Sequence, residues 1–165
     1  MKNSLLALCA MILVMNSHGQ PHYPKSGIKA PPIKVDEWVN DSITEKDLEG
    51  KTVVIEFWFT HCEPCIMAIP HLNKVEEKFK NDKVAFLAIT FDNKEEVKNF
   101  QTKMYMASSV GTDTLKTTIS AYDVNMFPTT VVIDTNGIIS WAGNPIYLES
   151  VLDTVVKNQQ NFKLK

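Results

Sequence analysis

Short apolar runs alternate with amphipathic stretches along most of the chain. Apolar runs predict buried strands at 53–59 and 84–91, and the second, which is continuous, is typical of a central strand covered on both faces. Further strands are expected at 33–39, 104–110, 129–134 and 138–142, the last two joined by a turn at Thr135-Asn136-Gly137. Helices are expected at 64–80, from a cap at Asp92 or Asn93 to Lys103, at 113–122 and at 148–156. This order predicts an α/β three-layer sandwich around a mixed sheet.

The apolar positions of two predicted helices indicate which faces pack against the sheet. Their helical spacing places these side chains on one face of each helix, and lysine and glutamate occupy the other face of the first. The expected inward residues are Met67, Ile69, Leu72, Val75 and Phe79 in the first helix, and Leu115, Ile119 and Tyr122 in the second.

Length and charge limit the possible functions. The 165 residues suffice for one domain with a sizeable core. The formal net charge is −2, and all 17 basic residues are lysines. Because arginine is the preferred residue for bidentate phosphate binding, its absence argues against nucleic-acid recognition.

The N-terminus has the features of an export signal. Lys2 supplies a positive charge, and the apolar run from Leu5 to Met15 is too short to span a bilayer as a helix. Small residues in Ser17-His18-Gly19 predict cleavage before Gln20; the alternative is an uncleaved membrane tether. The predicted organisation is a signal peptide at 1–19, an extended segment at 20–32 and one domain at 33–165. Without Cys9, which lies in the signal, the mature chain has only Cys62 and Cys65.

These two cysteines form a Cys-x-x-Cys motif where the first apolar run meets the first helix. The spacing brings both sulfurs within disulfide reach when the second cysteine lies one turn into a helix. The helix N-terminus favours a thiolate on the first cysteine, and Pro64 suits the first turn. We therefore expect Cys62 to be an exposed nucleophile and Cys65 a buried resolving thiol. Half of a zinc site is the alternative, but zinc normally requires two further ligands.

The chain resembles the thioredoxin superfamily, and within it the TlpA/ResA-like exported thiol–disulfide oxidoreductases. The matching residues run in family order and cover nearly all of the mature chain. The resemblance implies a thioredoxin-like fold with a TlpA-type insertion of a helix and a strand before a cis-proline, Pro128. The matching residues are Gly50-Lys51-Thr52-Val53-Val54, Phe57-Trp58, Cys62-Glu63-Pro64-Cys65, Pro70, Phe127-Pro128-Thr129-Thr130 and Ile133-Asp134-Thr135-Asn136-Gly137.

The resemblance also implies roles for residues around the motif. Glu56 lies in an otherwise apolar run, where it would sit beneath Cys65 and exchange a proton with it; a structural carboxylate bonded to a lysine or water is the alternative. Two residues depart from the family pattern: His61 replaces a tryptophan, and Ala68 replaces the glutamate of the ResA branch. His61 could stabilise the Cys62 thiolate or simply be solvated. The expected substrate-binding residues are Phe127, Pro128, Glu63, Pro64, His61 and Trp58.

The leading hypothesis is a periplasmic dithiol–disulfide oxidoreductase, more specifically a reductase. It would use the Cys62–Cys65 disulfide without a cofactor or metal, act as a monomer on protein or small-molecule disulfides, and receive electrons from a membrane-bound donor. A copper-binding protein of the Sco type is the alternative, since Phe59-Thr60-His61-Cys62 is similar to that group, although its cysteines are separated by three residues. The peroxiredoxin pattern requires proline at 55 and threonine at 59, where the chain has Ile55 and Phe59.

Overall fold

The computed structural model describes residues 22–80 and 83–163, and within them a six-stranded mixed sheet. The signal peptide expected at 1–19 lies outside the described residues. The strand order is β1-β4-β3-β2-β5-β6. The strands are β1 (Glu37–Trp38), β2 (Thr52–Trp58), β3 (Val84–Thr90), β4 (Ser109–Thr112), β5 (Thr129–Ile133) and β6 (Ile139–Gly143).

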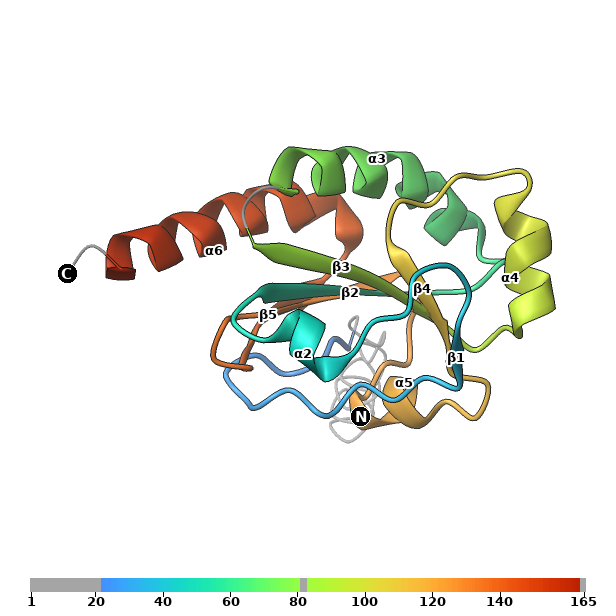
Figure 1. The fold of residues 1–165 in the computed structure, drawn as a ribbon, viewed down its shortest axis with the longest axis horizontal. Coiled ribbons are helices and arrows are strands. Elements are labelled where there is room, and N and C mark those ends of the chain that lie inside the picture. The colour runs from blue at the N-terminus through green and yellow to red at the C-terminus, as the bar shows by residue number, and fades with distance from the viewer. Residues whose placement is uncertain (1–21, 81–82, 164–165) are drawn as a thin grey trace, which may run out of the picture.

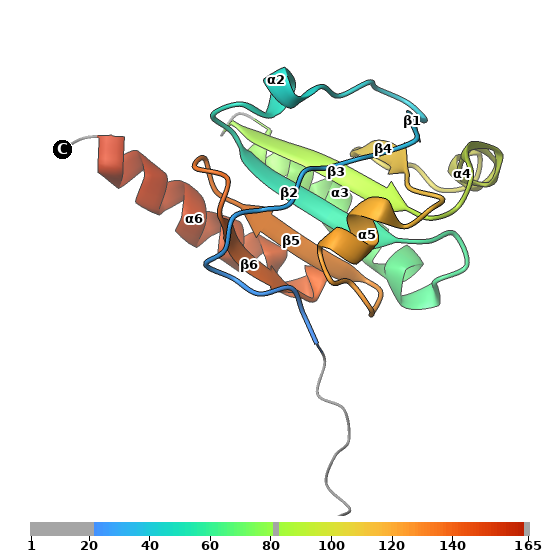
Figure 2. The same cartoon turned by 90° about the horizontal axis from the view of Figure 1, so that it is seen from below.

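Helices cover both faces of this sheet, which gives the three layers that the sequence predicts. Figure 1 shows α3 and α6 above the sheet and α2 and α5 below it, and Figure 2 shows α5 and the N-terminal segment from below. Within the described residues, no helix is both long and apolar enough to cross a membrane. The helices are α2 (Glu45–Leu48), α3 (Glu63–Phe79), α4 (Lys94–Gln101), α5 (Thr117–Ala121) and α6 (Leu148–Lys163), with a 3₁₀ turn, η1 (Pro145–Tyr147).

The central strand β2 carries the site. It pairs in parallel with β3 and antiparallel with β5, and all 7 of its residues are buried. Alternate side chains point to opposite faces of a strand. Ile55 and Phe57 accordingly join the core on the α5 side, whereas Val54 packs with side chains of α3 and α6. Glu56 shares the Val54 face, so its carboxyl points towards α3.

The segment before β1 bonds to the outer strand β6 and to the turn that precedes it. The Gly27 N–H donates to the Ile139 carbonyl at 2.8 Å, and the Ala30 N–H donates to the Gly137 carbonyl at 2.9 Å. These bonds protect a sheet edge that would otherwise expose unpaired backbone groups. Residues 27–30 therefore contact the sheet, and the domain boundary expected at 33 stays a prediction.

Two predicted strands are shorter or displaced. The strand expected at 33–39 is reduced to Glu37–Trp38, and that expected at 104–110 begins only at Ser109, which pairs with Leu87. The loop before β4 is held by hydrogen bonds to α3 instead of by pairing with a neighbouring strand. The Asn73 side chain donates to the Tyr105 carbonyl at 2.9 Å and accepts from the Ala107 N–H at 2.9 Å. The helix and strand, α4 and β4, lie between β3 and Pro128; that they are a TlpA-type insertion stays a prediction.

The helix predicted at 113–122 is also shorter, because its first residues form a turn around a carboxylate. Asp113, 1% exposed, accepts hydrogen bonds from the N–H groups of Thr117, Thr118 and Ile119, which fixes the start of α5. Leu115 lies in this turn and is 82% exposed, so its predicted inward position is wrong. Met67 was likewise expected to face inward, but it is 75% exposed on α3.

Replacing Asp113 by alanine should destabilise the fold. The change leaves three N–H groups without their acceptor, and those of Thr118 and Ile119 are buried, so we expect the free energy of unfolding to fall by about 3 kcal/mol. Urea unfolding measures this loss. Asp41→Ala is the control, because Asp41 is exposed and should leave the midpoint unchanged. Equal midpoints for wild type and Asp113→Ala would show that other groups hold α5.

Candidate active site

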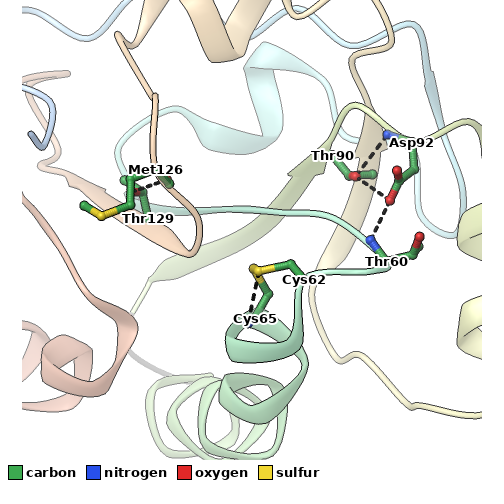
Figure 3. Close-up of a disulfide and its surroundings, with 7 residues drawn as sticks. All are labelled: Thr60, Cys62, Cys65, Thr90, Asp92, Met126 and Thr129. Atoms are coloured by element: carbon green, nitrogen blue, oxygen red, sulfur yellow. Dashed lines mark hydrogen bonds between the residues drawn. A yellow bond between two sulfur atoms is a disulfide. The ribbon is translucent and has the colours of Figure 1, made fainter. Parts of the chain in front are cut away.

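The two cysteines form a disulfide at the N-terminus of α3, with their Cα atoms 5.2 Å apart (Figure 3). Cys62 is the N-cap of the helix, and its Sγ accepts a hydrogen bond from the Cys65 N–H at 3.2 Å. Pro64 lies in the first turn, as predicted. Cys62 is 4% exposed and Cys65 1%, so the expectation of an exposed first cysteine is wrong for this disulfide form. Cys62 packs in a cluster with Trp58 and Ile69, which accounts for its burial.

A buried carboxylate fixes the turn before Cys62. Asp92 Oδ2 accepts from the Thr60 N–H at 2.6 Å and from the Thr90 hydroxyl at 3.2 Å (Figure 3). Sequence reasoning considered Asp92 only as a helix cap, whereas Asn93 is the observed N-cap of α4. The position of Asp92 in the sequence could have indicated this role. Asp92 comes just after β3, and the carboxyl ends of the parallel strands β2 and β3 meet at the same edge of the sheet.

Glu56 is buried opposite Thr130 on β5. It is 5% exposed, and its Oε2 accepts a hydrogen bond from the Thr130 hydroxyl, while Oε1 has no partner among the described residues. Burial raises the pKa of Glu56 to about 8, and the Thr130 hydroxyl opposes this rise. A carboxyl with this pKa can change its protonation state near neutral pH. The observed partner is a threonine, and no lysine among the described residues bonds to Glu56.

Glu56 and Cys65 line the same small cavity, of about 10 Å³, beneath the disulfide. This is the proximity that the family resemblance implies. Trp58 lines the cavity too, and its Nε1 has no hydrogen-bond partner among the described residues. Because Trp58 is 1% exposed, it offers almost no surface for the substrate contact that the sequence suggested.

Three aromatic side chains pack together, and two of them, Phe59 and Phe127, contact the cluster that contains the cysteines. The Phe59, Phe91 and Phe127 rings have centroids 5.1 to 5.7 Å apart, and each ring is half-buried. The peptide bond between Phe127 and Pro128 is cis, which confirms the prediction from the resemblance. Phe127 packs against the cluster that contains both cysteines, so the loop before β5 lies beside the disulfide.

The remaining predicted residues lie on the surface next to the disulfide. His61, Glu63 and Pro64 are all exposed, and His61 Nδ1 is 3.0 Å from the Thr60 hydroxyl oxygen. The ring is thus bonded to Thr60, and no hydrogen bond joins it to Cys62 in this arrangement. In the part of the chain that the structure describes, no three histidine, cysteine or acidic residues gather in a way that could hold a metal ion.

A dithiol that closes into a disulfide at a helix N-terminus can exchange two electrons and two protons with another disulfide. On this fold, that chemistry defines a thiol–disulfide oxidoreductase with a thioredoxin-like domain. The chain belongs to the AhpC/TSA family, whose profile matches residues 26–142.

Relatives of known type agree with this class. The thiol-disulfide oxidoreductase ResA of Bacillus cereus is 32% identical over 137 residues, which cover 81% of this chain and 79% of the relative. ResA of Halalkalibacterium halodurans is 28% identical over 142 residues, covering 83% and 81%. The protein is therefore a thiol–disulfide oxidoreductase.

Solved structures share the fold. A Chlorobium tepidum protein described as the thiol:disulfide interchange protein DsbE gives a TM-score of 0.74 at 23% identity, covering 81% of this chain and 99% of that one. A Neisseria meningitidis protein described as a thioredoxin gives 0.68 at 27% identity, covering 79% and 91%. These similarities confirm the thioredoxin-like architecture predicted from the sequence.

The raised pKa of Glu56 predicts a pH-dependent effect of Glu56→Gln on stability. The amide still accepts from Thr130 but does not titrate. Between pH 4.5 and about 8 the unfolded wild type releases a proton that the folded protein keeps, so wild-type stability falls as pH rises. Across this range the unfolding free energy of the variant, relative to that of wild type, should rise by up to about 1.4 kcal/mol per pH unit. Above pH 8 the difference between the two proteins should stay constant.

Urea unfolding of both oxidised proteins from pH 4 to 9 measures this gain. A difference in unfolding free energy that does not change with pH would mean that Glu56 ionises at its ordinary pKa in the folded protein.

Proposed function

We propose that the protein is an exported dithiol–disulfide reductase that acts through Cys62 and Cys65. The observation that carries this proposal is the position of Cys62 as N-cap of α3, with the Cys65 N–H directed at its sulfur. A sulfur in this position is stabilised as a thiolate by the helix end and can attack a disulfide.

The exchange requires two steps. The Cys62 thiolate attacks one sulfur of the substrate disulfide, a mixed disulfide forms, and the other substrate sulfur leaves as a thiolate. Cys65 then loses its proton and attacks Cys62 Sγ, which forms the Cys62–Cys65 disulfide and releases the second substrate thiolate. The substrate gains two electrons and the protein loses them, so another dithiol must reduce the protein again. We assign that task to a membrane-bound electron donor.

Glu56 is the proposed acceptor of the Cys65 proton. It lies beside the same cavity as Cys65, and a pKa of about 8 suits an acid–base group that works near neutral pH. The exposed Glu63, Pro64 and His61 would contact the substrate together with Phe127 and Pro128. Trp58 would contribute by packing beneath the pair instead of touching the substrate.

The reductive direction is supported by the few groups that stabilise the Cys62 thiolate. Strong oxidants of this class owe their potential to a well-stabilised reduced form. Here the Cys65 N–H is the one hydrogen-bond donor to Cys62 Sγ within residues 22–80 and 83–163, and His61 is bonded to Thr60 instead. The thiolate should therefore be only moderately stabilised, as in a reductant.

Export is proposed from the N-terminal sequence alone. A lysine followed by a short apolar run and small residues at 17–19 is the pattern of a signal peptide. In an oxidising compartment a reductive dithiol needs a continuous supply of electrons, which is consistent with the proposed membrane donor.

Cysteine substitutions test the order of attack. Cys65→Ser should accumulate a mixed disulfide with a substrate, because the second step lacks its nucleophile. Cys62→Ser should accumulate far less, because Cys65 is buried and less reactive. Non-reducing electrophoresis after reaction with a disulfide-bonded protein measures both. Equal trapping by the two variants would contradict Cys62 as the nucleophile.

The reduction potential tests the direction. Equilibration of the oxidised protein with glutathione buffers should give a value closer to that of thioredoxin, about −270 mV, than to that of DsbA, about −120 mV. His61→Ala is a matched variant that should shift the value little, because the His61 ring contacts Thr60 in preference to Cys62. An oxidising value would make the protein a disulfide donor.

A further inference from the structure

Each turnover must move a proton out of a buried place. Cys65 is 1% exposed and Glu56 is 5% exposed, so neither group reaches bulk water directly. A proton taken up by Glu56 in the proposed function must leave before Glu56 can act again. The structure should therefore contain polar groups that connect Glu56 with the surface.

The cavity beneath the disulfide is the first part of such a connection. Besides Glu56, Trp58 and Cys65, its wall includes Asn73 from α3 and Ser108 from the loop before β4. Glu56 Oε1 and Trp58 Nε1 are buried at this cavity without a partner among the described residues. A volume of about 10 Å³ is close to the minimum for one water molecule, and an acceptor and a donor are its natural partners.

Ser108 connects the cavity with a second carboxylate. Its hydroxyl donates to Glu76 Oε2 at 2.8 Å, across the contact between the loop and α3. Glu76 is half-buried, so it reaches both the serine and solvent. Asn73, one helical turn earlier, holds the same loop through Tyr105 and Ala107. The bonds from Asn73 thus hold the loop on α3 and keep Ser108 next to Glu76.

We propose that Ser108 and Glu76 form a proton exit from the redox site, leading from Glu56 through the cavity to the surface beside α3. Glu56 gives up its proton at the cavity, the Ser108 hydroxyl accepts a proton on that side and donates its own to Glu76, and Glu76 releases it to water. One proton leaves per disulfide formed, and no electrons move along the route. Ser108 and Glu76 are positioning and transfer groups that do not touch the substrate. The inference rests on the proposed function of Glu56.

The electrostatic surroundings suit this transfer. Burial raises the pKa of the Glu76 carboxyl and the Ser108 hydroxyl lowers it, so Glu76, like Glu56, can hold a proton closer to neutral pH than an exposed glutamate. Glu76 makes no ion pair with any described residue. The titratable residues that line the cavity are Glu56 and Cys65. A lysine bonded to Glu76 would have kept it ionised and prevented it from carrying a proton.

Reaction of the reduced protein with the chromogenic disulfide DTNB tests the route. Attack by Cys62 releases the first coloured thiolate, and resolution by Cys65 releases the second. In Glu76→Gln and Ser108→Ala we expect the first release to be unchanged and the second to slow by about tenfold near pH 7. Added imidazole, a small proton acceptor, should restore part of the rate in both variants.

Glu77→Gln is the matched control, because Glu77 is exposed on the same helix and pairs with Lys80. Its second release should equal that of wild type at every pH. A merely structural role of Glu76 would lower stability without responding to imidazole. Unchanged second release in Glu76→Gln and Ser108→Ala, with slowing in Glu56→Gln, would overturn the exit route but leave the proposed function standing. Failure of wild type to release two thiolates would instead contradict the proposed function itself.

Discussion

The pairing of β2 with both β3 and β5 is the constraint on which the site depends. This register places Glu56 opposite Thr130 on one side and opposite Ala88 on the other. It also sets the end of the strand, from which the chain turns through Thr60 into α3. A shift by one residue would move Glu56 to the face of α5 and replace it with an apolar side chain beneath the disulfide. The register thus determines both the position of the cysteines and the group that lies under them.

The cost of burying Glu56 bears on the role proposed for it. A carboxylate in an apolar strand is unfavourable when charged, and the single bond from Thr130 offsets only part of this cost. A lysine bonded to Glu56 would have held the carboxyl in its charged form. The chain instead leaves Glu56 with one unpaired oxygen beside a cavity. The proposed role of Glu56 requires a group of this kind, which can take up and release a proton.

Much of the fold could be predicted from the sequence, because its determinants are local. The runs at 53–59 and 84–91 are apolar except for Glu56 and Thr90, and Cys62-Glu63-Pro64-Cys65 marks the start of α3. The first strand, the motif and the helix therefore lie within one residue of their expected places. The displaced elements are those set by contacts distant in sequence. Nothing near residue 108 indicates that Asn73 ties this loop to α3, so 104–110 was expected to be a strand.

The same distinction applies to the site. Cys62, Cys65 and Glu56 were found because each contrasts with its neighbours in the sequence, and the cis bond before Pro128 followed from the family resemblance. Thr130 was present in a matched motif, but its bond to Glu56 depends on which strand lies beside β2. The contacts of polar residues whose partners are distant in sequence can therefore be identified only once the order of the strands in the sheet is known. Ser108 is a residue of this kind, because its bond to Glu76 depends on where the loop before β4 lies against α3.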